Sequence, residues 1–169
     1  MKKFFWAVIV VLLFLGAEPA GARADDDVSQ MPYCPICGMD RLKFARSRMV
    51  VHYEDGTRFG SCSLHCTALE LAYRPGKTPV KIEVGDYASE ILTDAEKAVW
   101  VLGGNKRGVM TMRAKWAFAR ASDAKKFIEQ YGGELVDFET AMEAAFADMY
   151  KDTLMIREKR KKMKHMKKE

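Results

Sequence analysis

Residues 48–73 read RMVVHYEDGTRFGSCSLHCTALELAY and contain a hairpin followed by a helix. RMVVHYE alternates as a strand does, Asp55-Gly56 is a favoured two-residue turn, and TRFGS is expected to return as the second strand. From CSLHC onward the apolar residues recur at helical spacing, until Arg74-Pro75-Gly76 ends the helix. Because PVKIEVGDY then alternates again, the predicted order of elements is β-β-α-β.

The second half of the chain predicts the same order. KAVWVLGG and RAKWAFAR indicate two strands joined by the loop GGNKRGVMTM, and ELVDF indicates a third. Between them Ser122-Asp123 opens a helix, which Gly132-Gly133 closes. Glu139 to Lys168 indicates one long helix with a basic, solvated end. We therefore predict an α+β fold of two ββαβ modules, residues 25–90 and 91–138, followed by a C-terminal helix and basic tail, residues 139–169.

The first 24 residues have the features of a secretory signal peptide. Lys2 and Lys3 precede the apolar run FFWAVIVVLLFLGA, and AGARA ends in a small-x-small pattern, so cleavage is expected near Ala24. No cysteine follows the apolar run as a site for a lipid anchor. We expect an exported, periplasmic protein of about 145 residues, which is enough for one domain with a hydrophobic core.

The positive charge is concentrated in the tail. The formal net charge is +5, and nine Lys or Arg against three acids follow from Lys151 onward. This distribution does not indicate a nucleic-acid-reading face, and we expect no nucleic-acid partner. The tail could add a weak contact with an acidic partner or an anionic membrane surface, at about 1 kcal/mol per well-placed basic residue. No enzyme signature such as G-x-S-x-G, H-E-x-x-H or a phosphate loop is present, so we expect no enzymatic activity.

Two close pairs of cysteines carry the strongest chemical signal. Cys34 and Cys37 lie in YCPICGMD, whereas Cys62 and Cys66 open the first predicted helix, where residues four apart share a face. Two close pairs separated by a hairpin are typical of small metal-binding knuckles. In an exported protein, disulfides within or between the pairs and a dithiol redox pair are the alternatives.

Methionines near the cysteines favour a soft metal. Met39 lies two residues after Cys37, and Gly38 permits a bend that turns both sulfurs to one side. Thiolate and thioether sulfurs together favour Cu(I), which accepts two or three ligands. The loop G-V-M-T-M adds Met110 and Met112, between two predicted strands where the lip of a pocket could form.

The remaining histidines and methionines have simpler explanations. His65, between Cys62 and Cys66, is balanced between a ligand and a bystander, and His52 is interpreted as structural. Met142 and Met149 fit helix packing. A few tail residues could bind a metal weakly, although a solvated basic tail is the favoured interpretation: Met163, His165 and Met166.

A series of motifs resembles the nitrous-oxide reductase accessory protein family, NosL, over roughly residues 31–143. The motifs are CGM, IEVGDY, TDAEKA, a glycine-rich loop with methionine, AFA and GGE, in that order. The resemblance implies a periplasmic Cu(I)-binding protein that delivers copper to nitrous-oxide reductase, built of paired ββαβ modules related to organomercurial lyase. The copper ligands that it implies fall on Cys37, Met39 and Met110, with Met112 as a close rival to Met110.

Other residues resemble a different pattern. Members of that family commonly carry a lipoprotein cysteine at the cleavage site, where this chain has Asp25. Cys34, Cys62, His65 and Cys66 resemble instead the cysteine knuckles of small heavy-metal chaperone domains of the TRASH and YHS type. Both resemblances imply soft-metal binding.

We therefore predict an exported Cu(I) metallochaperone that passes copper to a periplasmic copper protein. Its metal site is expected to draw on seven residues: Cys37, Met39, Met110, Cys34, Cys62, Cys66 and His65. The alternative is a structural zinc domain with a closed four-cysteine site, whose function lies in protein contacts. A dithiol redox protein is the third interpretation.

Overall fold

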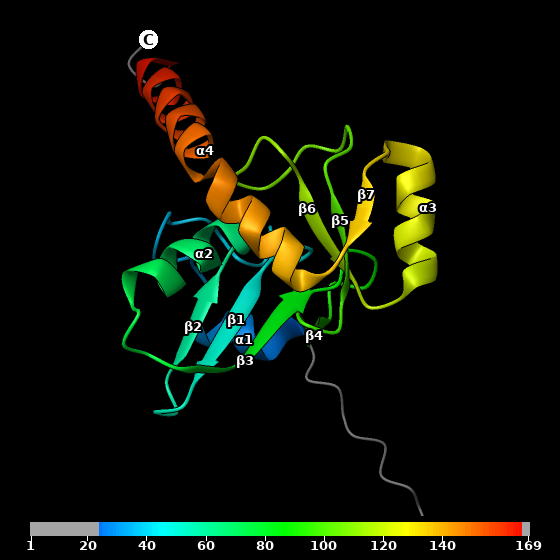
Figure 1. Ribbon diagram of the computed structural model, residues 1–169. Coiled ribbons are helices and arrows are strands. Elements are labelled where there is room, and N and C mark those ends of the chain that lie inside the picture. The colour runs from blue at the N-terminus through cyan, green and yellow to red at the C-terminus, as the bar shows by residue number, and fades with distance from the viewer. Residues whose placement is uncertain (1–23, 167–169) are drawn as a thin grey trace, which may run out of the picture.

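The computed structural model describes residues 24–166, so the predicted signal peptide lies outside the described residues except for Ala24. Figure 1 shows two small sheets with a long helix running between them. The elements follow in the order α1 (Ala24–Gln30), β1 (Met49–Tyr53), β2 (Arg58–Ser61), α2 (Leu64–Tyr73), β3 (Pro79–Gly85), β4 (Leu92–Asp94), β5 (Val99–Leu102), β6 (Lys115–Phe118), α3 (Ala121–Tyr131), β7 (Glu134–Val136) and α4 (Phe138–Met166).

The first sheet has the order β2-β1-β3-β4, with every neighbouring pair antiparallel. The predicted hairpin is confirmed, and the Asp55 carboxylate accepts a hydrogen bond from the backbone N–H of Thr57 at its turn. The short strand β4 was not predicted. It pairs with β3, so the first sheet extends past the expected module boundary at residue 90.

The second sheet repeats the arrangement with the order β6-β5-β7. In both sheets the strand after the helix returns antiparallel beside the first strand of its module, as the predicted ββαβ order requires. Gly132 ends α3 in the left-handed region, at a φ of 71°, where glycine has no steric penalty. The predicted fold class is confirmed.

One hydrophobic core joins the two halves. It takes buried residues from β1, α2, β5 and α4, among them Met49, Ala68, Trp100 and Ala141. In Figure 1, α4 crosses the space between the two sheets and contacts both α2 and β5. Met142 and Met149 pack against this core, which confirms their predicted structural role. Among the described residues no helix combines the length and the apolar character needed to cross a membrane.

Asp27 in α1 anchors the start of the described chain, although nothing in the sequence indicates this. Its side chain is buried and bonds both Arg41 and Arg48, at 2.7 and 3.0 Å between carboxylate oxygen and guanidinium nitrogen. Both arginine side chains are fully buried. Because the partners lie 14 and 21 residues away, local sequence patterns cannot reveal the pairing.

We expect Asp27→Ala to destabilise the fold by about 3–5 kcal/mol, because it leaves two buried guanidinium groups without a counter-charge. Urea unfolding of the reduced protein measures this change. The matched control is Arg120→Gln, which breaks a pair with Asp123 in which the arginine is largely exposed, and which we expect to cost less than about 1 kcal/mol. Equal effects of the two substitutions would contradict the anchoring role of Asp27.

Candidate metal centre

The first cysteine pair lies in a small closed loop. The Gly38 N–H donates to the Cys34 carbonyl at 2.8 Å, and the Cys34 N–H donates to the Met39 carbonyl at 2.9 Å. A bridge between Tyr33 and Asp40 closes the base of the loop. Gly38 has a φ of 76°, a conformation that other residues rarely adopt, so the bend expected at this glycine is present. The loop thereby holds the three sulfur-bearing side chains in fixed positions.

The second pair lies at the corner between β2 and α2. Cys62 follows the last residue of β2, Ser63 is the N-cap of α2, and Cys66 is in its first turn. The expectation that both cysteines share a helix face was therefore wrong, because the helix begins only at Leu64. The sharp corner nevertheless brings the sulfurs of Cys62 and Cys66 to 3.7 Å.

The two pairs meet in one cluster. The sulfurs of Cys37 and Cys62 are 3.4 Å apart, and the four cysteine sulfurs all lie within 4.8 Å of one another. Four sulfurs at about 2.3 Å from a tetrahedral ion would be about 3.8 Å apart, so a metal fits with small adjustments. Cys34, Cys62 and Cys66 are buried and Cys37 is partly exposed. All four cysteines are free thiols in this structure.

Thioether sulfurs border the thiol cluster on one side. The Met39 sulfur lies 3.9 Å from the Cys62 sulfur, and Met110 packs against the cluster from the loop between β5 and β6. Met110 has a φ of 59°, a strained conformation for a non-glycine residue. Met112 points elsewhere, since its side chain is exposed while its N–H donates to the Asp152 carboxylate at 2.8 Å. Of the two rivals, only Met110 therefore reaches the cluster.

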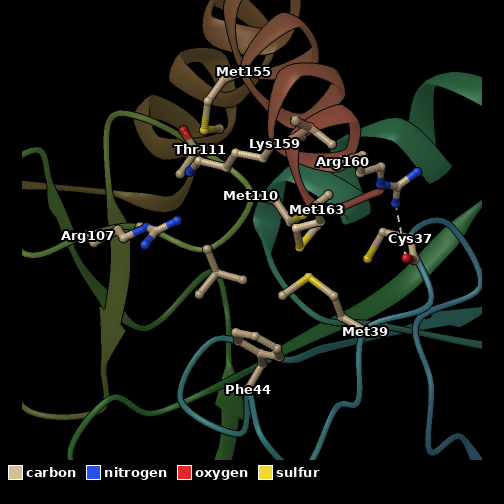
Figure 2. Close-up of a pocket in the computed structure, with 13 residues that line it drawn as sticks. Cys37, Met39, Phe44, Arg107, Met110, Thr111, Met155, Lys159, Arg160 and Met163 are labelled. Carbon is tan, nitrogen blue, oxygen red and sulfur yellow. Dashed lines mark hydrogen bonds between the residues drawn. The ribbon is translucent and has the colours of Figure 1, made fainter. Parts of the chain in front are cut away.

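A pocket of about 570 Å³ opens beside these sulfurs. In Figure 2, Cys37, Met39 and Met110 border this pocket together with residues from the end of α4. The Arg160 side chain of α4 donates to the Cys37 carbonyl at 3.1 Å, as the dashed line in Figure 2 marks. The contribution of α4 was missed in the sequence, where the basic composition of its end favoured a solvated tail.

His65 is buried but lies outside the group of four cysteine sulfurs. Its Nδ1 is 3.7 Å from an oxygen of Asp152 in α4, and neither atom has a hydrogen-bond partner among the described residues. Burial lowers the pKa of His65, against the opposing effect of Asp152. His52 bonds Glu83 on the neighbouring strand at 2.7 Å, as expected of a structural residue. The structure thus gathers six of the seven predicted site residues, and His65 faces α4 instead.

The thiols of the cluster differ in acidity because they hydrogen-bond one another. The pKa of Cys34 is lowered, since its sulfur accepts hydrogen bonds from Cys37 first and then from Cys62 and Cys66. The pKa values of Cys62 and Cys66 are raised, first because each thiol bonds the Cys34 sulfur, then because it bonds Cys37, and further because burial disfavours charge. The metal-free cluster therefore holds the thiols of Cys62 and Cys66 in the neutral form, whereas Cys34 ionises more readily.

The two sheets, the long helix and the site define a domain with a sulfur cluster that fits a metal ion. Residues 26–146 match the NosL family, and the chain belongs to that family. The fold resembles the crystal structure of the copper chaperone NosL from Shewanella denitrificans, with 23% sequence identity, a TM-score of 0.51, and coverage of 63% of this chain and 87% of that chain. A comparison with curated proteins finds no match.

We expect the metal-free, reduced protein to lose stability as the pH rises above about 8.5. There the unfolded chain ionises its thiols, whereas Cys62 and Cys66 stay neutral in the fold, so each contributes a loss of up to about 1.4 kcal/mol per pH unit. Cys34 affects stability in the opposite direction and at lower pH, because its pKa is lowered in the fold. Its contribution to the stability of the fold is complete above about pH 8.5 and is lost as the pH falls through its folded-state pKa.

Urea unfolding between pH 7 and 9.5, with a chelator and a non-thiol reductant, measures how steeply the free energy of unfolding falls with pH. Tyr53, whose pKa is raised to about 12 by burial, adds a similar loss only above about pH 10. Cys66→Ala should reduce the slope by about half. A stability that stays constant up to pH 9.5 would contradict the acidities described above.

Proposed function

We propose that this protein is an exported Cu(I) carrier that binds the ion at its sulfur cluster and passes it to a copper protein outside the cytoplasm. The observation that carries the proposal is the donor set. Cysteine thiols and the Met39 thioether lie within bonding reach of one ion, and no carboxylate or imidazole joins them among the described residues. Membership of the NosL family and the fold shared with a copper chaperone support the same function.

Methionine favours copper over zinc at this position. Zinc in proteins is bound by cysteine, histidine and carboxylates, whereas thioether sulfur selects Cu(I). Met39 and Met110 both pack against the cysteine cluster from separate loops. A closed zinc site would not require thioethers beside its cysteines.

The sulfur ligands differ in their exposure to solvent, and this difference suits an ion that is passed on to another protein. Cys34, Cys62 and Cys66 are buried, while Cys37 and Met39 border the open pocket. Cu(I) held by Cys37, Met39 and Met110 would have few enough ligands to leave a position for a sulfur or imidazole of the acceptor. Ligand exchange would then transfer the ion without enzymatic chemistry. Nitrous-oxide reductase is the acceptor that the family resemblance implies, and the periplasm is the matching compartment.

A structural zinc ion in the cysteine cluster is the second candidate. Four thiols within 4.8 Å of one another, three of them buried, are the observation that favours it. Zinc at such a site contributes directly to folding, so a chelator that removes it should unfold the protein. Metal analysis of protein purified under reducing conditions shows whether zinc is bound. Treatment with a chelator then separates the two candidates, because the copper carrier is expected to stay folded without metal.

We expect the reduced protein to withdraw Cu(I) from a chromogenic chelator in a competition titration. Cys37→Ser should weaken Cu(I) binding by about 100-fold and Met39→Leu by about tenfold, which correspond to about 2.8 and 1.4 kcal/mol. The control is Met142→Leu, which replaces a methionine that packs against the main core and should leave the affinity unchanged.

Two results would contradict the proposal. In the first, the reduced protein takes up no Cu(I) from the chelator. In the second, Cys37→Ser and Met142→Leu bind Cu(I) equally well, which would place the ion elsewhere in the molecule.

A further inference from the structure

The end of α4 forms one wall of the pocket beside the sulfur cluster. This wall lies outside the segment that matches the NosL family. The match to the NosL family ends at residue 146, whereas α4 continues to Met166. Five of the thirteen residues that line the pocket lie beyond that point: Met155, Ile156, Lys159, Arg160 and Met163. This chain therefore closes its pocket with a segment of its own.

The spacing of these five residues places them on one face of the helix. They recur at intervals of one, three and four positions, which is the pattern of a single helical stripe. The buried residues of α4 end at Asp152, so burial in the core does not hold this part of the helix in place. The stripe faces the sulfur site although the surrounding sequence, REKRKKMKHM, is strongly basic.

Hydrogen bonds tie α4 to both of the loops that carry the sulfur ligands. Arg160 donates to the Cys37 carbonyl at 3.1 Å, and Asp152 accepts from the Met112 N–H at 2.8 Å. The first bond holds the helix to the cysteine loop and the second to the loop of Met110. The helix is thus positioned over the space between the two loops.

The side chains in that space are suited to a soft monovalent ion. In Figure 2 the side chains of Met39, Met110 and Met163 project into the same space, with the Cys37 thiol at its edge. No carboxylate is among the described residues that line the pocket, while three cations are: Arg107, Lys159 and Arg160. Neutral thioethers beside positive charges disfavour hard, divalent cations, so Cu(I) is the metal ion that suits this space.

We propose that Met163 is a further Cu(I) ligand, which with Met39 and Met110 forms a thioether site at the mouth of the pocket. This proposal rests on the proposed copper-carrier function and deepens it. The ion would pass between the thioether site and the Cys37 thiolate. Because thioethers are uncharged, they bind the ion less strongly than the thiolate does, and the site would serve entry and release.

Simple packing makes a different prediction about Met163. Methionine often fills apolar space on a helix face, and leucine would serve that purpose about as well. Met163 is 50% exposed, so little core packing depends on it. Met163→Leu therefore removes the sulfur while keeping the apolar side chain.

The test uses the full reduced chain with methyl-¹³C-labelled methionines, titrated with Cu(I) under nitrogen. We expect the methyl resonances of Met39, Met110 and Met163 to shift together, and Met163→Leu to lower the Cu(I) affinity about tenfold with an unchanged melting temperature. The control is Met166→Leu, which alters a 67% exposed methionine of the same helix that does not line the pocket. It should leave the affinity unchanged.

The outcomes separate this proposal from the function on which it rests. If the Met39 and Met110 resonances shift while that of Met163 does not, Met163 is no ligand and the copper-carrier function stands. If no methionine resonance shifts and no Cu(I) is bound, the proposed function fails and this proposal fails with it. Should Met163→Leu prove unstable, the shift of the Met163 resonance in the unaltered protein decides.

Discussion

The buried guanidinium of Arg41 joins the segments whose meeting creates the sulfur cluster. It donates to the carbonyls of Met31, ahead of the cysteine loop, of Ser61, next to Cys62, and of Met49 in β1. The counter-charge of Asp27 offsets the cost of burying it. The guanidinium lies so close to Gly60 that a Cβ there would approach its carbon to 2.7 Å. This interaction thereby helps to hold the two cysteine pairs close together.

Most of the fold could be predicted because its signals are local. The hairpin turn, the alternating strands and the glycine-terminated helix each depend on a few adjacent residues, and both ββαβ modules were predicted from them. The strand β4 has only three residues and no clear alternation, so it was missed. Helix α1 was missed for a different reason, since its burial depends on Asp27 meeting two arginines that are distant in sequence.

The metal site also combines features that local sequence predicts with features that depend on residues distant in the sequence. The C-x-x-C-G-M spacing predicts a loop that presents Cys34, Cys37 and Met39, because the geometry is contained within that stretch. The choice between Met110 and Met112 depends instead on the positive φ of Met110, which no sequence pattern reveals. The position of His65 depends on Asp152, which approaches from α4 more than 80 residues later.

The helix α4 connects the core to the site. Its first half packs against α2 and β5, and its second half borders the pocket while carrying the basic residues of the tail. This arrangement places positive charge around an opening lined by the sulfur side chains of cysteine and methionine. An acidic surface on a copper-accepting partner would be attracted to the same opening.

X-ray absorption on anaerobically Cu(I)-loaded protein reports the ligand atoms and the geometry of the bound ion together. We expect a copper shell of sulfur alone, with two or three ligands. A shell dominated by nitrogen or oxygen, with the scattering pattern of an imidazole ring, would contradict it.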